Sequence, residues 1–366
     1  MLSMSKMGAS WRSAGSTVAA RLFLDRQAEF WMGELDPVRS LGELRARVIE
    51  VIEETRDTKT FVLRPNGAWG GHRAGQYTSV EAEIDGVRVR RCYSISSAPS
   101  EALVSITVKR VADGRVSTWL HQNVRAGHVL GLGAPAGDFV LPSPTPDKLL
   151  LLSGGSGITP VMSMLRDLAV RNAMGDVVFV HHARSRAEVI FGEELAHLAA
   201  CHTGLRLVLC LDDDVSSPPG FDEAHFAKLV PDFPERSTFL CGPRPLMDRV
   251  EGLFGSVGAS DRLELERFTP SLPLLPTNAS VDAVHIRLGH SDRNVVAKGH
   301  GSLLEQLERA GERPAHGCRI GICRSCKCLK QSGTVQNLVT GEVSSEPDQE
   351  IQLCISIPRS DLELDL

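Results

Sequence analysis

The stretch that decides how this chain is organised is residues 316–328, HGCRIGICRSCKC. It holds four of the nine cysteines in a protein of 366 residues. Cys318, Cys323 and Cys326 have the spacing C-x4-C-x2-C, and Cys354 follows in IQLCISIP. Four thiolates at this spacing hold a plant-type 2Fe–2S cluster. The sequence therefore predicts an iron–sulfur site with these four cysteines as ligands.

Structural zinc is the alternative for this cluster of thiols. Zinc sites usually show two C-x2-C pairs, whereas here the second pair is missing and the four-residue gap is atypical. Cys328 is a surplus thiol, which we expect to face away from the site, although it could exchange with Cys326 as a ligand. An odd number of cysteines gathered at one end does not fit a secreted disulfide framework. Reduced thiols instead predict a cytoplasmic protein, with a position at the inner face of the membrane left open.

Composition sets further limits on the class of protein. A length of 366 residues exceeds what one hydrophobic core usually supports, so more than one domain is expected. The net charge of −5 argues against a nucleic-acid partner, which would require a basic face. No apolar run approaches the roughly 20 residues that span a bilayer, and no signal-peptide core is present.

The pattern changes several times along the chain, which predicts a multidomain α/β and β protein. Residues 1–42 form an N-terminal extension, which is read either as a helix packed on the body or as a transit peptide. Short glycine-broken β runs in residues 43–143 predict an antiparallel barrel. Strands and helices alternate in residues 144–270, as in a doubly wound parallel sheet. A proline-rich linker, residues 271–280, leads to a last domain, residues 281–366.

Two motifs in the predicted barrel point to a flavin. RCYS at residues 91–94 resembles the Arg-x-Tyr-Ser signature of ferredoxin–NADP reductase-type flavin domains. This resemblance implies that Arg91 binds phosphate, that Tyr93 lies against the isoalloxazine and that Ser94 lies near flavin N5, with Ser94 as a catalytic residue. GRVSTWL, residues 114–120, resembles the helix start that cradles flavin pyrophosphate. Its cofactor-binding residues would be Gly114, Val116, Ser117 and Thr118, with Ser117 as the helix N-cap.

A glycine-rich turn and a cysteine motif point to a nicotinamide nucleotide. SGGSGITP at residues 153–160 follows an apolar strand and opens a helix, where a pyrophosphate lies in a doubly wound sheet. It resembles the reductase family's Gly-x-Gly-x-x-Pro loop, and CGPRPLM at residues 241–247 resembles its Cys-Gly-Pro motif. The resemblance implies that catalytic Cys241 lies near nicotinamide C4; the alternative is an ordinary buried cysteine at a strand end. The predicted nucleotide-binding residues are Gly154, Gly155, Gly157, Thr159, Pro160, Cys241, Gly242 and Pro243.

The choice of cofactors rests on fewer residues. Arg184, Ser185 and Arg186 follow the second strand of the predicted parallel sheet, where NAD enzymes usually carry a carboxylate. This favours NADPH through its 2′-phosphate, with NADH as the alternative and solvated surface arginines as the other reading. The pyrophosphate-type segment favours FAD, with FMN as the alternative.

Residues from about 281 to 366 resemble a plant-type ferredoxin domain, which implies a β-grasp-like fold. The resemblance extends over the chain beyond Leu41 and implies an electron-transfer enzyme that passes electrons from NADPH through flavin and a 2Fe–2S cluster to a terminal oxygenase. Three segments are most similar to bacterial NADPH oxidoreductases that serve membrane di-iron fatty acyl-CoA desaturases: FWMGELDPVRSLGELRARVIEV, HGCRIGICRSCKC and SGTVQNLVTGE.

Other functions stay open at this point. The chain could be the reductase of a soluble ring-hydroxylating or epoxidising oxygenase, or an iron–sulfur redox sensor. For the desaturase reading, the aromatic and initially basic extension is a candidate for peripheral association with a membrane.

Overall fold

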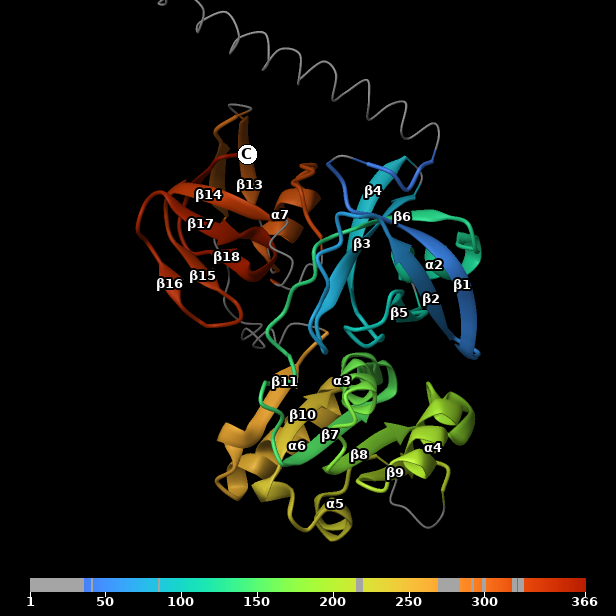
Figure 1. The fold of residues 1–366 in the computed structure, drawn as a ribbon. Coiled ribbons are helices and arrows are strands. Elements are labelled where there is room, and N and C mark those ends of the chain that lie inside the picture. The colour runs from blue at the N-terminus through green and yellow to red at the C-terminus, as the bar shows by residue number, and fades with distance from the viewer. Residues whose placement is uncertain are drawn as a thin grey trace, which may run out of the picture.

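Three domains, each built on its own sheets, follow one another along the chain (Figure 1). The structure is a computed structural model, and it describes residues 36–40, 42–84, 86–112, 114–214, 220–268, 283–290, 293–297, 301–317, 321 and 326–366. The predictions made for the extension up to residue 35, for the linker 271–280, and for Cys318 and Cys323 lie outside these residues.

The first domain is an antiparallel six-stranded sheet with the order β4-β3-β6-β1-β2-β5. An isolated bridge between Ile95 and Ile106 joins the end of β4 to β5 and closes the sheet into a barrel. Alternate residues of β1 are buried, among them Ala46 and Val48, as expected where one strand face meets a core. The strands are β1 (Arg45–Thr55), β2 (Thr58–Pro65), β3 (Tyr77–Ile84), β4 (Val87–Ser94), β5 (Val104–Lys109) and β6 (Val129–Leu132).

Helix α2 (Arg115–Asn123) lies between β5 and β6 in the sequence and covers the barrel. Its residues Val116 and Leu120 are buried in the barrel core. They lie four positions apart, which is the spacing of one helix face. The start of α2 is thereby held close to β3 and β4.

The second domain is a parallel five-stranded sheet with the order β11-β10-β7-β8-β9. Helices α3 and α4 pack on one face, and α5 and α6 on the other. The strand order reverses at β7, so the carboxyl ends of β7 and β10 form the crevice at which α/β proteins bind ligands. The elements are β7 (Lys148–Gly154), α3 (Ile158–Val170), β8 (Asp176–Ala183), α4 (Gly192–Cys201), β9 (Leu205–Leu211), α5 (Glu223–Leu229), β10 (Ser237–Cys241), α6 (Arg244–Ser256) and β11 (Leu263–Glu266).

The C-terminal domain has a five-stranded mixed sheet, β13-β12-β19-β14-β17, and a small sheet, β16-β15-β18. Helix α7 begins with a capping box between Ser302 and Glu305 and buries three leucines. The elements are β12 (Val284–Leu288), β13 (Arg293–Ala297), α7 (Leu303–Arg309), β14 (Lys327–Ser332), β15 (Val335–Asn337), β16 (Val343–Ser344), β17 (Gln349–Gln352), β18 (Ser356–Pro358) and β19 (Leu362–Leu364).

Side chains of α3 bind the barrel through its backbone. Ser163 Oγ donates to the carbonyl of Ser97 at 2.6 Å, and Arg166 Nη1 donates to the carbonyl of Ser96 at 2.6 Å. Arg166 also forms an ion pair with Glu194 of α4 at 2.5 Å. These contacts hold the parallel sheet against the barrel.

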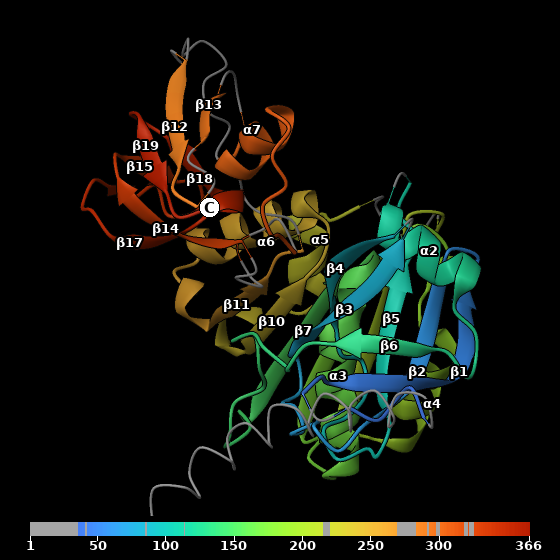
Figure 2. The ribbon, with the colours of Figure 1, turned by 90° about the horizontal axis from the view of Figure 1, so that it is seen from above.

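The C-terminal domain lies beside the edge strand β4 of the barrel, in both views of the molecule (Figures 1 and 2). Arg91 of β4 donates from Nη1 to the carbonyl of Gly317 at 2.8 Å. The predicted fold class of barrel, doubly wound sheet and β-rich C-terminal domain is confirmed. Within the described residues, no helix combines the length and apolar composition needed to cross a lipid bilayer.

Candidate active site and cluster site

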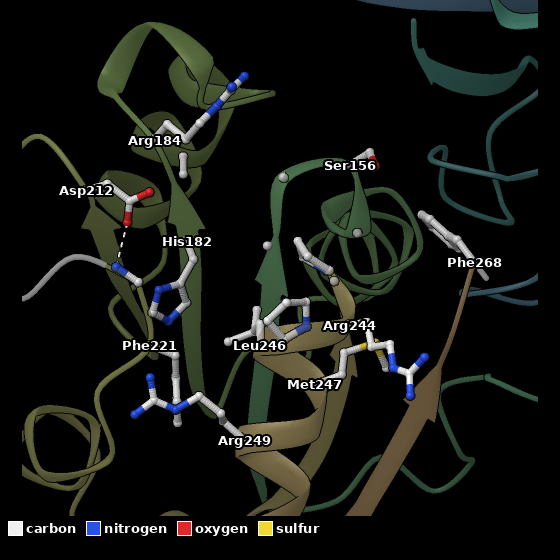
Figure 3. Close-up of a pocket in the computed structure, with 18 of the residues that line it drawn as sticks. Ser156, His182, Arg184, Asp212, Phe221, Arg244, Leu246, Met247, Arg249 and Phe268 are labelled. Carbon is white, nitrogen blue, oxygen red and sulfur yellow. Dashed lines mark hydrogen bonds between the residues drawn. The ribbon is translucent and has the colours of Figure 1, made fainter. Parts of the chain in front are cut away.

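A cavity of about 710 Å³ opens at the carboxyl ends of the parallel strands (Figure 3). The turn after β7 supplies Gly154, Gly155 and Gly157 to its wall, and the turn after β10 supplies Gly242 and Pro243. The two sequence motifs that predicted a nucleotide site thus border one cavity. Thr159 and Pro160 lie buried in the first turn of α3 behind it, where Thr159 Oγ1 donates to the carbonyl of Ser156 at 3.0 Å.

The two turns pack backbone against backbone, which explains their glycines. A Cβ at Gly157 would lie 2.2 Å from the carbonyl oxygen of Cys241, far inside normal contact. A Cβ at Gly154 would lie 2.9 Å from Pro243 Cδ and 2.8 Å from Leu246 Cδ2. Gly155 has a φ of +52°, which side-chain-bearing residues rarely adopt. Close approach of β7 and β10 therefore dictates these residue types.

Three side chains from two domains meet at the barrel end of the crevice. Cys241 and Glu266 are direct neighbours at the ends of parallel strands β10 and β11. Ser94 ends β4 of the barrel, and its Oγ donates to Glu266 Oε2 at 3.4 Å. All three side chains are buried. The structure therefore brings together the two predicted catalytic residues, Ser94 and Cys241, around a carboxyl group.

Burial keeps this group of side chains uncharged near neutral pH. Burial raises the pKa of the Glu266 carboxyl to about 8. The hydrogen bond from Ser94 opposes this shift, because it lowers the pKa of the carboxyl. Burial also raises the pKa of the Cys241 thiol well above its ordinary value, and the nearby Glu266 adds to this shift. Glu266 consequently holds a proton, and Cys241 stays a thiol, at pH 7.

The far end of the cavity, over β8 and β9, is exposed and charged. Arg184 lines it, but its guanidinium is bonded to Glu188, with Nε donating at 2.7 Å and Nη2 at 2.6 Å. Asp212, directly after strand β9, also lines this end of the cavity and accepts a hydrogen bond from the Gly220 amide at 2.7 Å. Arg186 lines a different groove, between α4 and the barrel.

The structure therefore places only one of the two predicted arginines at the nucleotide cavity. Ser185 lies between them and does not line the cavity. The reason is the 3₁₀ turn Arg186–Glu188, which turns the chain towards α4 directly after Arg184.

The predicted flavin-binding residues lie on neighbouring parts of the barrel. Tyr93 packs against the barrel core, and burial raises its pKa. Gly114 and Thr118 lie in the first turn of α2, where the Gly114 N-cap makes no side-chain hydrogen bond. Arg91, predicted to bind phosphate, donates to the carbonyl of Gly317 in the C-terminal domain and to the carbonyl of Arg90 at 2.7 Å.

The prediction that Ser117 is the N-cap of this helix is wrong. Helix α2 begins at Arg115, so Gly114 is its N-cap and Ser117 lies three residues further on. The Ser117 hydroxyl accepts from the Val111 amide at 3.2 Å and donates to the Gly114 carbonyl at 3.3 Å. Ser117 thus stabilises the loop before the helix.

Two of the four predicted cluster ligands lie within the described residues and converge. Cys326 Sγ and Cys354 Sγ are 3.2 Å apart, and both side chains are buried. The Gly321 amide donates to Cys354 Sγ at 3.2 Å, and a Cβ at Gly321 would lie 2.8 Å from Ile355 Cδ1. Two buried cysteine sulfurs in close approach, one of them accepting from a backbone amide, fit a 2Fe–2S site.

Cys328 Sγ contacts backbone carbonyls, and the nearer one is that of Leu329 at 3.5 Å. Its Sγ lies 3.9 Å from the carbonyl of Asp365, and burial raises the pKa of this thiol to about 11. The expectation that the surplus cysteine faces away from the cluster stays a prediction.

Sequence reasoning missed three residues of the crevice. No motif of the sequence singled out Glu266, yet its carboxyl group lies beside Cys241 and Ser94 in the buried site. Phe268, two residues later, lines the cavity with an exposed ring, opposite Arg184 in Figure 3. Lys109 reaches the cavity from the barrel. The one available signal was ERF at residues 266–268, which begins with the last residue of β11; nothing in the sequence distinguishes Lys109.

Comparison with known families agrees with this arrangement. Residues 45–141 match the oxidoreductase FAD-binding domain, residues 151–252 match the oxidoreductase NAD-binding domain, and residues 286–359 match the 2Fe-2S iron-sulfur cluster binding domain. The chain thus has the domains for all three predicted cofactors.

Relatives and a solved structure align with most of the chain. An NADPH oxidoreductase of Mycobacterium tuberculosis is 39% identical over 356 residues, which cover 95% of this chain and 91% of the relative. The glycine betaine monooxygenase reductase subunit of Chromohalobacter salexigens is 34% identical over 351 residues, covering 88% and 95%. The structure of phthalate dioxygenase reductase aligns with a TM-score of 0.63 and 26% identity over 89% of this chain and 98% of that one.

These matches cover all three domains in one order and leave no doubt about the class of protein. The chain belongs to the family of NAD(P)H-dependent flavin oxidoreductases with a C-terminal 2Fe–2S domain.

Proposed function

We propose that this protein is an NADPH-dependent reductase that supplies electrons to a membrane di-iron fatty acyl-CoA desaturase. The observation that carries the electron path is the meeting of three domains around the crevice. Ser94 of the barrel lies beside Cys241 and Glu266 of the parallel sheet, and Arg91 on the same strand contacts Gly317. Gly317 directly precedes Cys318, a predicted cluster ligand.

The chain's own residues offer suitable surroundings for a flavin at this point. A second cavity, of about 720 Å³, is bordered by Tyr77 and Ser79 of the barrel, by Glu266 and by Gly321 of the cluster loop. When bound, the flavin accepts a hydride from the nicotinamide, and the cluster carries single electrons onward. A flavin at the proposed position would therefore lie next to both the nicotinamide, which donates the electrons, and the cluster, which accepts them.

In this proposal the crevice residues orient the substrate and control a proton. Cys241 offers an uncharged, compact side chain at the place where the nicotinamide ring would lie. Glu266 holds a proton at its carboxyl below about pH 8, one hydrogen bond from Ser94 Oγ. The Phe268 ring limits access of water from the outer side.

NADPH is supported by the charge of the nucleotide cavity. Five cationic side chains and two acidic ones line it, while burial lowers the pKa of His182 to about 4 and keeps it neutral. Three carboxylates outside the lining, Asp57, Asp248 and Glu251, pair with three of these cations. NADPH carries about two more negative charges than NADH, because its phosphate monoester ionises like that of a phosphorylated side chain. The relative from Mycobacterium tuberculosis is named for the same nucleotide.

The desaturase as electron acceptor is supported by the resemblance of three sequence segments, HGCRIGICRSCKC, SGTVQNLVTGE and FWMGELDPVRSLGELRARVIEV. The test is NADPH-driven desaturation of stearoyl-CoA by the flavin- and iron-replete protein with membranes that contain a candidate desaturase. Cytochrome c reduction is followed in parallel. An oleoyl product that depends on this protein supports the proposal, whereas cytochrome c reduction without product excludes this acceptor.

A soluble oxygenase is the second candidate acceptor. It is favoured by two relatives that are named as reductase components of glycine betaine monooxygenase and 3-ketosteroid-9-alpha-monooxygenase, which are 34% and 32% identical. The same assay with a purified soluble oxygenase and its substrate distinguishes the two acceptors.

A further inference from the structure

The two ends of the nucleotide cavity differ, because only one end lies near the place where Ser94 of the barrel meets Cys241 and Glu266. At that end, Cys241 is the last residue of β10 and Glu266 the last residue of β11, and Ser94 lies beside them. The glycine turn after β7 lies in the middle, where a pyrophosphate fits. The sheet order places β8 and β9 beyond β7. A dinucleotide with its nicotinamide at Cys241 must therefore extend its adenosine over the ends of β8 and β9.

The wall at this adenosine end contains aromatic side chains and a cation. His182 at the end of β8 lies beside Phe221, with ring centroids 5.8 Å apart. Arg249, from the second turn of α6, reaches over the other side of Phe221, with its guanidinium carbon 5.9 Å from the ring centroid. Figure 3 shows these three side chains on one wall of the cavity, with Asp212 above them.

The other cations of the cavity already have carboxylate partners. Four ion pairs account for them: Lys109–Asp57 at 3.2 Å, Arg184–Glu188 at 2.6 Å, Arg244–Asp248 at 3.3 Å and Arg267–Glu251 at 2.6 Å. Arg249 is the fifth cation. Among the residues that the structure describes, no carboxylate forms an ion pair with it.

An arginine in this setting is suited to a phosphate monoester. Its planar guanidinium donates two parallel hydrogen bonds to phosphate oxygens, and stacking on an aromatic ring orients it without using its N–H groups. The Arg249 side chain is exposed, so its donors can reach a ligand in the cavity. Arg184, by contrast, would first have to give up Glu188.

We propose that Arg249 binds the 2′-phosphate of NADPH and sets the preference of this protein for NADPH over NADH. This inference rests on the proposed use of NADPH. Sequence patterns place the residue that selects the nucleotide at the strand end, at Arg184. In this proposal that residue lies on helix α6.

The test measures binding of two adenosine fragments by calorimetry with the holoprotein. Adenosine 2′,5′-bisphosphate carries the 2′-phosphate, and 5′-AMP lacks it. For Arg249→Ala we expect the affinity ratio between the two fragments to fall about tenfold or more, the range for losing a charged hydrogen-bonded pair. Arg249→Lys keeps the charge and should recover part of the ratio. The ratio of kcat/KM for NADPH and NADH should change in parallel.

Two matched variants make the result specific. Arg206→Ala removes an exposed arginine at the opposite end of β9 and should leave the ratio unchanged. Arg184→Ala tests the competing assignment. If Arg249→Ala kept the wild-type ratio and Arg184→Ala lost it, the inference would be overturned while NADPH use stood. If the wild type bound both fragments equally, the NADPH part of the proposed function would fail, and this inference with it.

Discussion

The two ends of the nucleotide cavity are built by different means. At the barrel end, Cys241, Glu266 and Ser94 are buried, uncharged near neutral pH and held by strand ends and close backbone packing. At the adenosine end, Arg184 and Arg249 are exposed and held by side-chain contacts alone. The redox chemistry thus depends on backbone geometry, whereas the choice of nucleotide depends on side chains that can change without altering the fold.

The largest effect expected from this comparison is at Gly157. In Gly157→Ala the new Cβ would meet the Cys241 carbonyl at 2.2 Å, so the turn or the end of β10 must move. We expect kcat/KM for NADPH to fall about a hundredfold, the size reported for misplacing reacting groups by about 1 Å. Gly252→Ala is the control, because it lies inside α6 with nothing within 4 Å, and should raise stability by up to about 1 kcal/mol. Wild-type rates for Gly157→Ala would disprove the steric account.

The second prediction separates the cluster from the flavin. Cys326→Ser should abolish NADPH-driven cytochrome c reduction and leave most ferricyanide reduction, because only the first acceptor needs the cluster. Cys328→Ala is the matched control, since its sulfur faces Asp365, and it should keep the visible absorbance of the cluster. Parallel loss of both activities in Cys326→Ser would show that the domain needs its cluster to fold, or that the order of transfer differs.

The third prediction concerns the buried carboxyl of Glu266. The folded protein keeps this proton up to a pKa of about 8, whereas the unfolded chain releases it near 4.5. Stability should therefore fall as pH rises between these values, by at most about 1.4 kcal/mol per pH unit. Glu266→Gln should remove this dependence on pH. The melting temperature of the variant, relative to that of the wild type, should therefore rise between pH 5 and pH 8. Parallel curves would mean that Glu266 ionises normally in the fold.

The smallest effects are expected at the exposed arginines that sequence patterns favoured. Arg184→Ala should change the KM for NADPH only a few-fold, because its Glu188 partner already offsets an exposed charge. Arg186→Ala should leave both nucleotides unaffected, since it lines another groove. Steady-state kinetics with NADPH and NADH test both variants. A tenfold loss specific to NADPH in Arg186→Ala would place the 2′-phosphate outside the cavity described here.

The same contrast explains which parts could be predicted from the sequence. The glycines of SGGSG and the CGP turn could be located because close packing of the two turns at Gly154 and Gly157 excludes other residues. The strand patterns likewise gave the order and type of the domains. The partner of Arg184 and the direction of Arg186 depend on a 3₁₀ turn that has no clear sequence signal. Glu266 was missed because it becomes part of the site only when β11 pairs with β10, far from the other motifs in sequence.

The contacts of α3 with the barrel bear on how such reductases can be recombined. Ser163 and Arg166 donate to the carbonyl oxygens of Ser97 and Ser96, groups that every barrel of this shape presents whatever its side chains. A transplanted nucleotide domain would keep these two bonds through a hydroxyl and a guanidinium three positions apart on its first helix, whereas the contact of Phe139 with Phe239, with ring centroids 5.7 Å apart, depends on side chains of both domains. In a chimera with a foreign barrel, this nucleotide domain should dock correctly. The same exchange removes Arg91, and with it the bond from the barrel to the iron–sulfur domain.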